Sequence, residues 1–167
     1  MLNKVQCEAE LYAGMGRWLE NRLKDKYRNV DCDVFVEDCH SNYLDSILEK
    51  HGVIKYFPQL VGVKIEIDVL GIVRQKEKAD IFLIEAKKNA LTLQNLGQLL
   101  VYAKLCDPKE AYLLSPRGLG SLEKVFTHLN REDLLDYGAG GKIKKICVAK
   151  WNIEKEGIDM LTVLPKI

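Results

Sequence analysis

The sequence has no run of apolar residues that approaches the roughly 18–20 needed to cross a bilayer. Its first residues, MLNKVQCEAE, lack the apolar core of a secretion signal, so we expect a cytoplasmic protein without a membrane contact. Neither sign of charge predominates, because 25 basic and 24 acidic residues leave a net charge of +1. A protein that coats nucleic acid by charge alone is far more basic. Any nucleic-acid contact therefore needs a local basic surface, a metal ion or a dimer.

Cysteine pairs at metal-binding spacing are also missing. The five cysteines are scattered without a C-x-x-C sequence, which argues against a zinc ribbon or an iron–sulfur cluster and for reduced thiols. His40, His51 and His128 have no carboxylate or metal-binding pattern beside them, so we expect them on the surface. The chain also lacks a G-x-S-x-G sequence and a phosphate-binding P-loop, which leaves few alternatives to metal-dependent chemistry.

Hydrophobic spacing predicts a single α/β domain over residues 1–167, with a mixed β-sheet flanked by helices. The predicted helices cover residues 8–27, 41–52, 121–138 and a stretch from residue 89 or 92 to about 105. The predicted strands cover residues 32–38, 64–73, 79–88, 111–116, 142–151 and 158–164. Segment 41–60 lies between the first strand and the next one as an apparent insertion, where we would look for specificity.

Residues 64–102 carry polar side chains that core packing alone does not explain. Asp68 is on the polar face of an alternating strand, and Glu85 and Lys87 share one face of the next strand. Carboxylates are hard oxygen ligands for Mg²⁺ or Mn²⁺, and the backbone carbonyl of Ala86 could be a further one. A lysine beside them can stabilise the charge that grows on phosphorus or orient the attacking water. This residue set suits phosphodiester hydrolysis.

The order of these residues resembles the PD-(D/E)XK nuclease superfamily: Asp68, then Glu85-Ala86-Lys87 on the next strand, then Gln98-x-x-x-Tyr102 on the next helix. The pair Gln98 and Tyr102, one helical turn apart, makes the chain most similar to the RecB-like and archaeal Holliday-junction-resolvase-like branch. Ile67 stands where the superfamily name has proline. The resemblance covers about residues 8–102 and implies a restriction-endonuclease-like core.

The resemblance also implies a role for each residue. Asp68 and Glu85 look like the metal ligands, together with the backbone carbonyl of Ala86, and Lys87 looks like the catalytic lysine. Gln98 is similar to the glutamine that contacts phosphate or supports the site, and Tyr102 to its partner one turn on. Glu8, on the inward stripe of the first helix, looks like the acid that completes the metal site, although an acid there also suits the helix dipole.

Basic residues near the site and toward the C-terminus could contact the phosphates of a substrate. The candidates are Lys88, Arg117, Lys142 and Lys144. The alternative is that these lysines are solvated residues of a strand edge, where they discourage aggregation. Glu85 and Lys87 could likewise be an exposed ion pair with little effect on stability.

We therefore expect a Mg²⁺- or Mn²⁺-dependent nuclease that cuts DNA as an endonuclease. A homodimer is expected because a small, nearly neutral domain has limited surface to grip a duplex. The alternatives are a catalytically inactive DNA-binding or regulatory module of the same fold, a junction-resolving or exonuclease variant, and RNA as the substrate. The cysteine spacing of the RecB-like exonucleases with an iron–sulfur cluster is absent, which excludes that branch.

Overall fold

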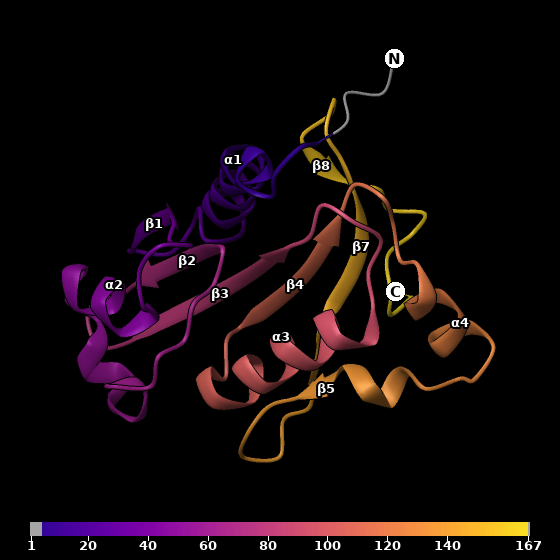
Figure 1. Cartoon of the computed structure of the whole chain (residues 1–167). Coiled ribbons are helices and arrows are strands. Elements are labelled where there is room, and N and C mark those ends of the chain that lie inside the picture. Colours follow the sequence, from indigo (N-terminus) through magenta and orange to yellow (C-terminus); the bar gives the residue numbers. More distant parts are fainter. Residues whose placement is uncertain (1–4, 167) are drawn as a thin grey trace.

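The computed structural model describes residues 5–166, whose strands form a mixed six-stranded sheet in the order β1-β2-β3-β4-β7-β8 (Figure 1). Strands β1, β2 and β3 pair antiparallel, β3, β4 and β7 pair parallel, and β8 is antiparallel to β7. The bounds are β1 (Asp33–Asp38), β2 (Val69–Arg74), β3 (Ala79–Ala86), β4 (Glu110–Ser115), β7 (Cys147–Asn152) and β8 (Gly157–Ile158). A separate ribbon consists of β5 (Asp136–Tyr137) and β6 (Lys144–Lys145). The expected mixed sheet with flanking helices is confirmed.

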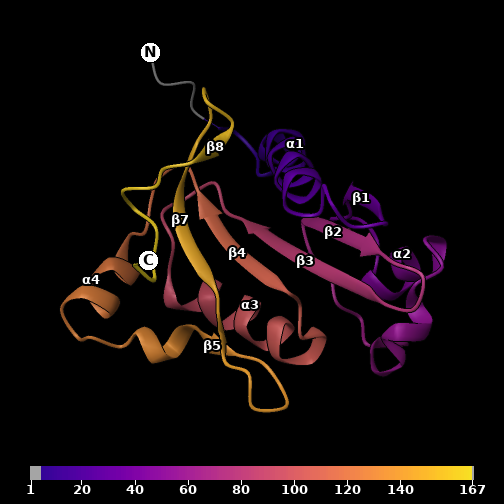
Figure 2. The same ribbon diagram turned by 180° about the vertical axis from the view of Figure 1, so that it is seen from behind.

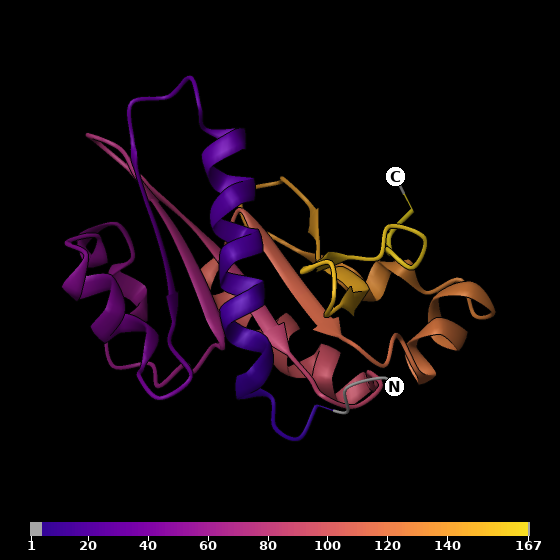
Figure 3. The same cartoon turned by 90° about the horizontal axis from the view of Figure 1, so that it is seen from above.

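Helices cover both faces of this sheet. Helix α1 (Ala9–Lys26) crosses one face, and α3 (Leu93–Cys106) lies on the other (Figures 1 and 3). The face with α3 also carries α2 (Leu44–Lys50), α4 (Ser121–Thr127) and the short 3-10 turns η1 (Ile54–Tyr56), η2 (Pro58–Leu60) and η3 (Glu132–Leu135). Seen from behind, the C-terminal segment runs beside β7, which it meets through a bridge between Val148 and Leu164 (Figure 2).

The side chains of β3 alternate between two buried cores, one on each face of the sheet. Phe82, Ile84 and Ala86 pack in the core under α1, whereas Ile81 and Leu83 pack in the core on the α3 face. Segment 41–60 adds apolar side chains to the second core, so it is a packed part of the fold. No helix between residues 5 and 166 combines the length and the apolar character needed to cross a membrane.

Local signals explain where the helix next to the site begins and ends. Thr92 caps α3, because its side chain accepts from the N–H of Asn95 while the Asn95 side chain accepts from the N–H of Thr92. The helix ends at Asp107, which has a left-handed backbone with φ of 47°, directly before Pro108. Helix α3 is therefore the connection between the parallel strands β3 and β4, and it fixes Gln98 on one face of the sheet.

The prediction of a continuous strand over residues 64–73 is wrong in its first half. Ladder pairing begins at Val69, opposite Ile84, and the residues before it form no ladder with β3. Its backbone bonds elsewhere, since the carbonyl of Ile65 accepts from the N–H of Leu44. The buried and exposed residues alternate as predicted, yet Asp68 stands just before β2 and is not inside a strand.

Four further predicted elements are shorter than expected. The helix over 41–52 is limited to α2. Helix α4 ends at Thr127, because the chain turns through Asn130 with φ of 51° before η3 and β5 form. The predicted strand 142–151 is divided at Ile146, whose N–H donates to the carbonyl of Leu135. The last predicted strand is limited to β8, after which the chain turns. In each case apolar spacing alone extends the predicted element beyond the residues that form it.

Gly71 is expected to be essential for close packing of α1 on β2. A Cβ atom there would lie 2.9 Å from Leu23 Cδ1 and 3.0 Å from Leu19 Cδ2, both in buried side chains. Gly71→Val should therefore lower the free energy of unfolding by about 1–3 kcal/mol. Gly97→Ala is the control, because nothing lies within 4 Å of its added Cβ and helix propensity favours alanine. Urea unfolding measures both, and an unchanged midpoint for Gly71→Val would contradict the prediction.

Candidate active site

The end of β3 brings the two predicted carboxylates together. Oδ2 of Asp68 accepts a 2.8 Å hydrogen bond from the backbone N–H of Ala86. Val69 pairs with Ile84 across the hairpin, so Asp68 stands beside the last residues of β3. Glu85 directly precedes Ala86 and points to the α3 face. The carboxylates thus flank one short stretch of backbone.

Glu85 holds two hydrogen-bond donors on a single oxygen. Its Oε1 accepts from Lys87 Nζ at 2.8 Å and from Gln98 Nε2 at 3.1 Å. Lys87 follows the end of β3, but its N–H still donates to the carbonyl of Leu114 on β4, which holds its backbone in line with the strand. Glu85 is 3% exposed, so this is a buried contact and the alternative of an exposed ion pair is wrong. Three predicted site residues therefore meet directly.

The start of α1 adds a third carboxylate and a tyrosine. Oε1 of Glu8, the residue before α1, accepts a 3.4 Å hydrogen bond from the backbone N–H of Lys88. Tyr12 is buried one helical turn later. Burial and the neighbouring Asp68 carboxylate raise the pKa of the Tyr12 hydroxyl, which keeps it a neutral hydrogen-bond donor.

Burial and like charges raise the proton affinity of the carboxylates. Burial raises the pKa of Glu85 to about 7, and the charge of Asp68 adds to this effect. Burial also raises the pKa of Asp68, although the N–H of Ala86 opposes it. For Lys87, burial lowers the pKa, but the hydrogen bond to Glu85 and the nearby carboxylate charges outweigh it and raise the pKa. Burial and mutual repulsion therefore make it costly to ionise both carboxylates in this site.

A divalent cation fits this donor set by its chemistry. Mg²⁺ and Mn²⁺ prefer oxygen ligands, which Asp68, Glu85 and the carbonyl of Ala86 can provide. The N–H and the C=O of one strand residue point to the same side of the strand. The carbonyl of Ala86 therefore faces the side on which its N–H donates to Asp68. No three Asp, Glu, His or Cys side chains between residues 5 and 166 already surround one metal position. The proposed ligand set therefore consists of two carboxylates and one backbone carbonyl, and a bound cation would offset the charge of the carboxylates.

No protein-family model matches this chain, and the search of curated proteins finds no relative. The resemblance of residues 8–102 to the PD-(D/E)XK superfamily therefore stays a prediction, as does the restriction-endonuclease-like core. What the structure adds is independent of any relative. It brings Glu85, Lys87 and Gln98 into contact, with Asp68 bonded to the backbone beside them.

The remaining predicted residues lie around this centre or away from it. Tyr102, one turn beyond Gln98, is partly buried against the core on the α3 face and makes no hydrogen bond to the carboxylates within residues 5–166. Lys88 follows the site, and its Nζ donates to the carbonyl of Gln6 at 3.2 Å. Arg117 is exposed after β4, which runs parallel to β3, so it lies at the same end of the sheet.

Lys144 lies at the opposite end of the sheet from Glu85. Its Nζ donates to the carbonyl of Pro108 at 2.7 Å and pairs with Asp107, both of which precede β4. Lys142 is exposed two residues earlier on the same ribbon connection. The predicted nucleic-acid contacts therefore divide into Lys88 and Arg117 near the carboxylates and the two ribbon lysines away from them.

Tyr12 and His40, which the sequence patterns did not assign to the site, lie near Asp68. Tyr12 is four residues after Glu8, a spacing that places both on one helix face, so this signal was present in the sequence. The expectation that His40 lacks a carboxylate partner is wrong, because its Nδ1 lies 2.5 Å from Oδ1 of Asp38. His40 is exposed as expected. The expectation for His51 is wrong on both counts, because its side chain is only 12% exposed and its Nε2 lies 3.1 Å from Oε1 of Glu37.

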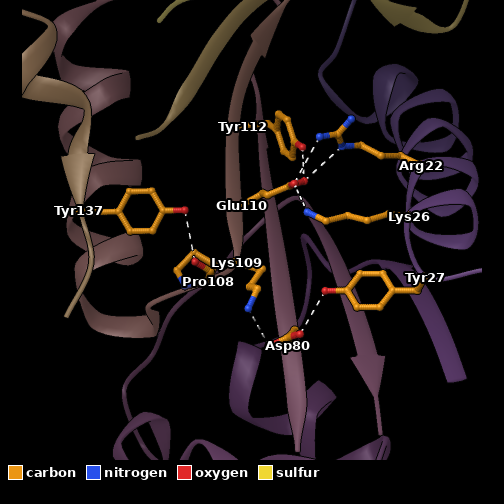
Figure 4. Close-up of polar contacts among 9 residues, drawn as sticks. All are labelled: Arg22, Lys26, Tyr27, Asp80, Pro108, Lys109, Glu110, Tyr112 and Tyr137. Carbon is orange, nitrogen blue, oxygen red and sulfur yellow. Dashed lines mark hydrogen bonds and ion pairs between the residues drawn. The ribbon is translucent and has the colours of Figure 1, made fainter. Parts of the chain in front are cut away.

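Charged contacts at the far end of α1 hold the helix on the sheet. Glu110, the first residue of β4, accepts hydrogen bonds from Arg22, Lys26 and Tyr112 (Figure 4). We call these four residues the Glu110 cluster. Because α1 is a single helix with its two site residues at the opposite end, the cluster helps to hold those residues against the carboxylates.

Proposed function

We propose that this protein is a metal-dependent nuclease that hydrolyses DNA phosphodiester bonds as an endonuclease. The observation that supports this most is the buried oxygen of Glu85, which accepts from both Lys87 and Gln98 beside the Asp68 carboxylate. An ion pair that only stabilised the fold would not need a further carboxylate next to it, since like charges in a buried site are costly.

Each residue has a distinct task in this proposal. A divalent cation held by Asp68, Glu85 and the Ala86 carbonyl would polarise the phosphate and lower the pKa of a bound water. Lys87 places a positive charge beside the phosphate oxygens as their charge grows. Gln98 holds the Glu85 carboxylate in one orientation, and it does so from α3, whose capped start fixes the helix.

Metal-dependent cleavage of DNA tests this proposal. Wild-type protein with Mg²⁺ or Mn²⁺ is expected to cut supercoiled plasmid, and EDTA should abolish the reaction. Lys87→Ala should reduce the rate at least about a hundred-fold, as loss of a group that stabilises transition-state charge does. Lys104→Ala, an exposed lysine on α3, is the matched control and should leave the rate unchanged. Cleavage that Lys87→Ala leaves intact, or no cleavage of any substrate, would refute the proposal.

The same assay with other substrates distinguishes the variants of this function. Linear, single-stranded and branched DNA are compared with RNA under one metal condition. Preference for branched DNA would indicate a junction-resolving enzyme, and cleavage from ends would indicate an exonuclease. DNA binding without cleavage and without calorimetric Mn²⁺ binding would indicate an inactive binding module instead.

A further inference from the structure

A histidine–aspartate pair lies beside the carboxylate centre and has no part in the reaction described so far. Asp38 is the last residue of β1, and its Oδ1 lies 2.5 Å from Nδ1 of His40. The same oxygen accepts from the backbone N–H of His40 at 3.4 Å. Nε2 makes no hydrogen bond to any other residue between 5 and 166. The aspartate therefore orients the imidazole by one nitrogen and leaves the other available.

The backbone that presents Asp68 also holds the loop that carries His40. The N–H of Cys39 donates to the carbonyl of Asp68 at 3.0 Å, and Sγ of Cys39 donates to the carbonyl of Ile67 at 3.1 Å. Cys39 is only 1% exposed, so the loop is anchored in the core. His40 follows directly, with 44% of its side chain exposed. The loop therefore places an exposed histidine directly after the residue that bonds to the backbone of Asp68.

Tyr12 connects this histidine to the site. The rings of Tyr12 and His40 are 5.0 Å apart and tilted by 42°. The ionisable groups that face His40 are Asp38 from β1, Tyr12 from α1 and Asp68 from the stretch before β2. Hydrogen bonding to Asp38 raises the pKa of the His40 imidazole, and the charge of Asp68 adds to this. Both carboxylates thus favour the positively charged ring.

We propose that His40 is a substrate-contacting residue, whose imidazolium, oriented by Asp38 and packed on Tyr12, donates from Nε2 to a phosphate of bound nucleic acid. The identity of that phosphate rests on the proposed nuclease function. The carboxylates of this site repel a phosphodiester, so a cationic donor at the α1 side lowers the cost of its approach. Asp38 is then a positioning residue that acts through His40.

Steady-state cleavage kinetics test the contact. His40→Ala should lower kcat/KM about ten- to a hundred-fold, the effect of one hydrogen bond to a charged group. His128→Ala, an exposed histidine at the end of α4, should leave it unchanged. The ratio of wild type to His40→Ala should be largest at acidic pH and shrink as the imidazole loses its proton. In an Asp38→Asn background this loss should occur at lower pH. A ratio that does not change with pH would overturn the proposal.

NMR of the histidine rings separates failure of this contact from failure of the nuclease function. Wild-type protein is titrated with a short single-stranded DNA in Ca²⁺, a hard cation that takes the same oxygen ligands. The Nε2 signal of His40 should shift and its pKa should rise, because a phosphate stabilises the imidazolium, while His51 and His128 signals stay in place. If wild type cuts DNA but the His40 signals do not move, the contact is refuted. If they move but nothing is cut, the hydrolytic function is refuted and the contact stands.

Discussion

Glu85→Gln is expected to abolish metal-dependent cleavage and, at the same time, to make the metal-free protein more stable. Loss of a proposed ligand to the cation should reduce the rate about a thousand-fold or more, since a catalytic divalent cation supplies several kcal/mol of transition-state stabilisation. Stability should rise because glutamine keeps an oxygen that accepts from Lys87 and Gln98 but brings no charge into a buried site. A carboxylate present only for stability would give the opposite result.

The pH dependence of this gain follows from the pKa of Glu85. That pKa is about 7 in the folded protein, above its ordinary value of 4.5, so the folded state binds the proton more tightly than the unfolded chain. The charged carboxylate therefore costs stability as the pH rises from about 4.5 to 7, and the full cost is present above 7. The advantage of Glu85→Gln should grow across that window and then stay constant.

Urea unfolding in EDTA at several pH values measures the effect. Glu66→Gln, which changes an exposed carboxylate in the stretch before β2, is the matched control and should alter neither stability nor cleavage. Adding Mg²⁺ should raise the unfolding midpoint of wild type by mass action and have much less effect on Glu85→Gln. A variant that is less stable than wild type at pH 8 in EDTA would show that Glu85 is part of a net stabilising ion pair.

Sequence spacing predicts the site where neighbouring residues share one strand or one helix face. Glu85 and Lys87 are two apart on a strand, so their common face follows from backbone geometry alone. Contact with Gln98 needs the crossover helix to lie on that same face. The hand of the crossover between the parallel strands β3 and β4 decides the face, and parallel pairing alone does not. Sequence spacing also places Asp68 at the correct end of the hairpin, although the strand β2 begins one residue later.

Contacts that depend on tertiary packing could not be predicted in this way. The spacing of Tyr12 from Glu8 places both on one helix face, but only the crossing of α1 over the sheet brings Tyr12 to Asp68. The pairing of His40 with Asp38 depends on a turn that Cys39 anchors. Lys144 belongs to a short ribbon, whose contact with Pro108 carries it away from the carboxylates. The order of charged residues along the sequence does not show how far apart they lie in the folded protein.

Glu110→Gln is expected to destabilise the protein by about 2 kcal/mol, because it removes the anion that Arg22 and Lys26 share. Glu110 is 20% exposed, which places this cost below that of a fully buried pair. Burial alone would raise the pKa of Glu110, but hydrogen bonds from Arg22, Lys26 and Tyr112 outweigh it and lower the pKa. The stabilisation is therefore present above the unfolded-state pKa and is lost as the pH falls through the lower folded-state value.

Thermal unfolding between pH 3 and pH 8 tests the role of the Glu110 cluster, with Glu156→Gln as the control. Glu156 also pairs with α1, through Arg17, but both partners are well exposed, so solvent screens the pair and it should contribute little to stability. Wild type should lose its advantage over Glu110→Gln in acid, whereas a constant difference would show that the charge is unimportant. If the cluster also positions α1, Glu110→Gln should weaken cleavage more than Glu156→Gln does, because Glu8 and Tyr12 reach the carboxylates only while α1 keeps its place on the sheet.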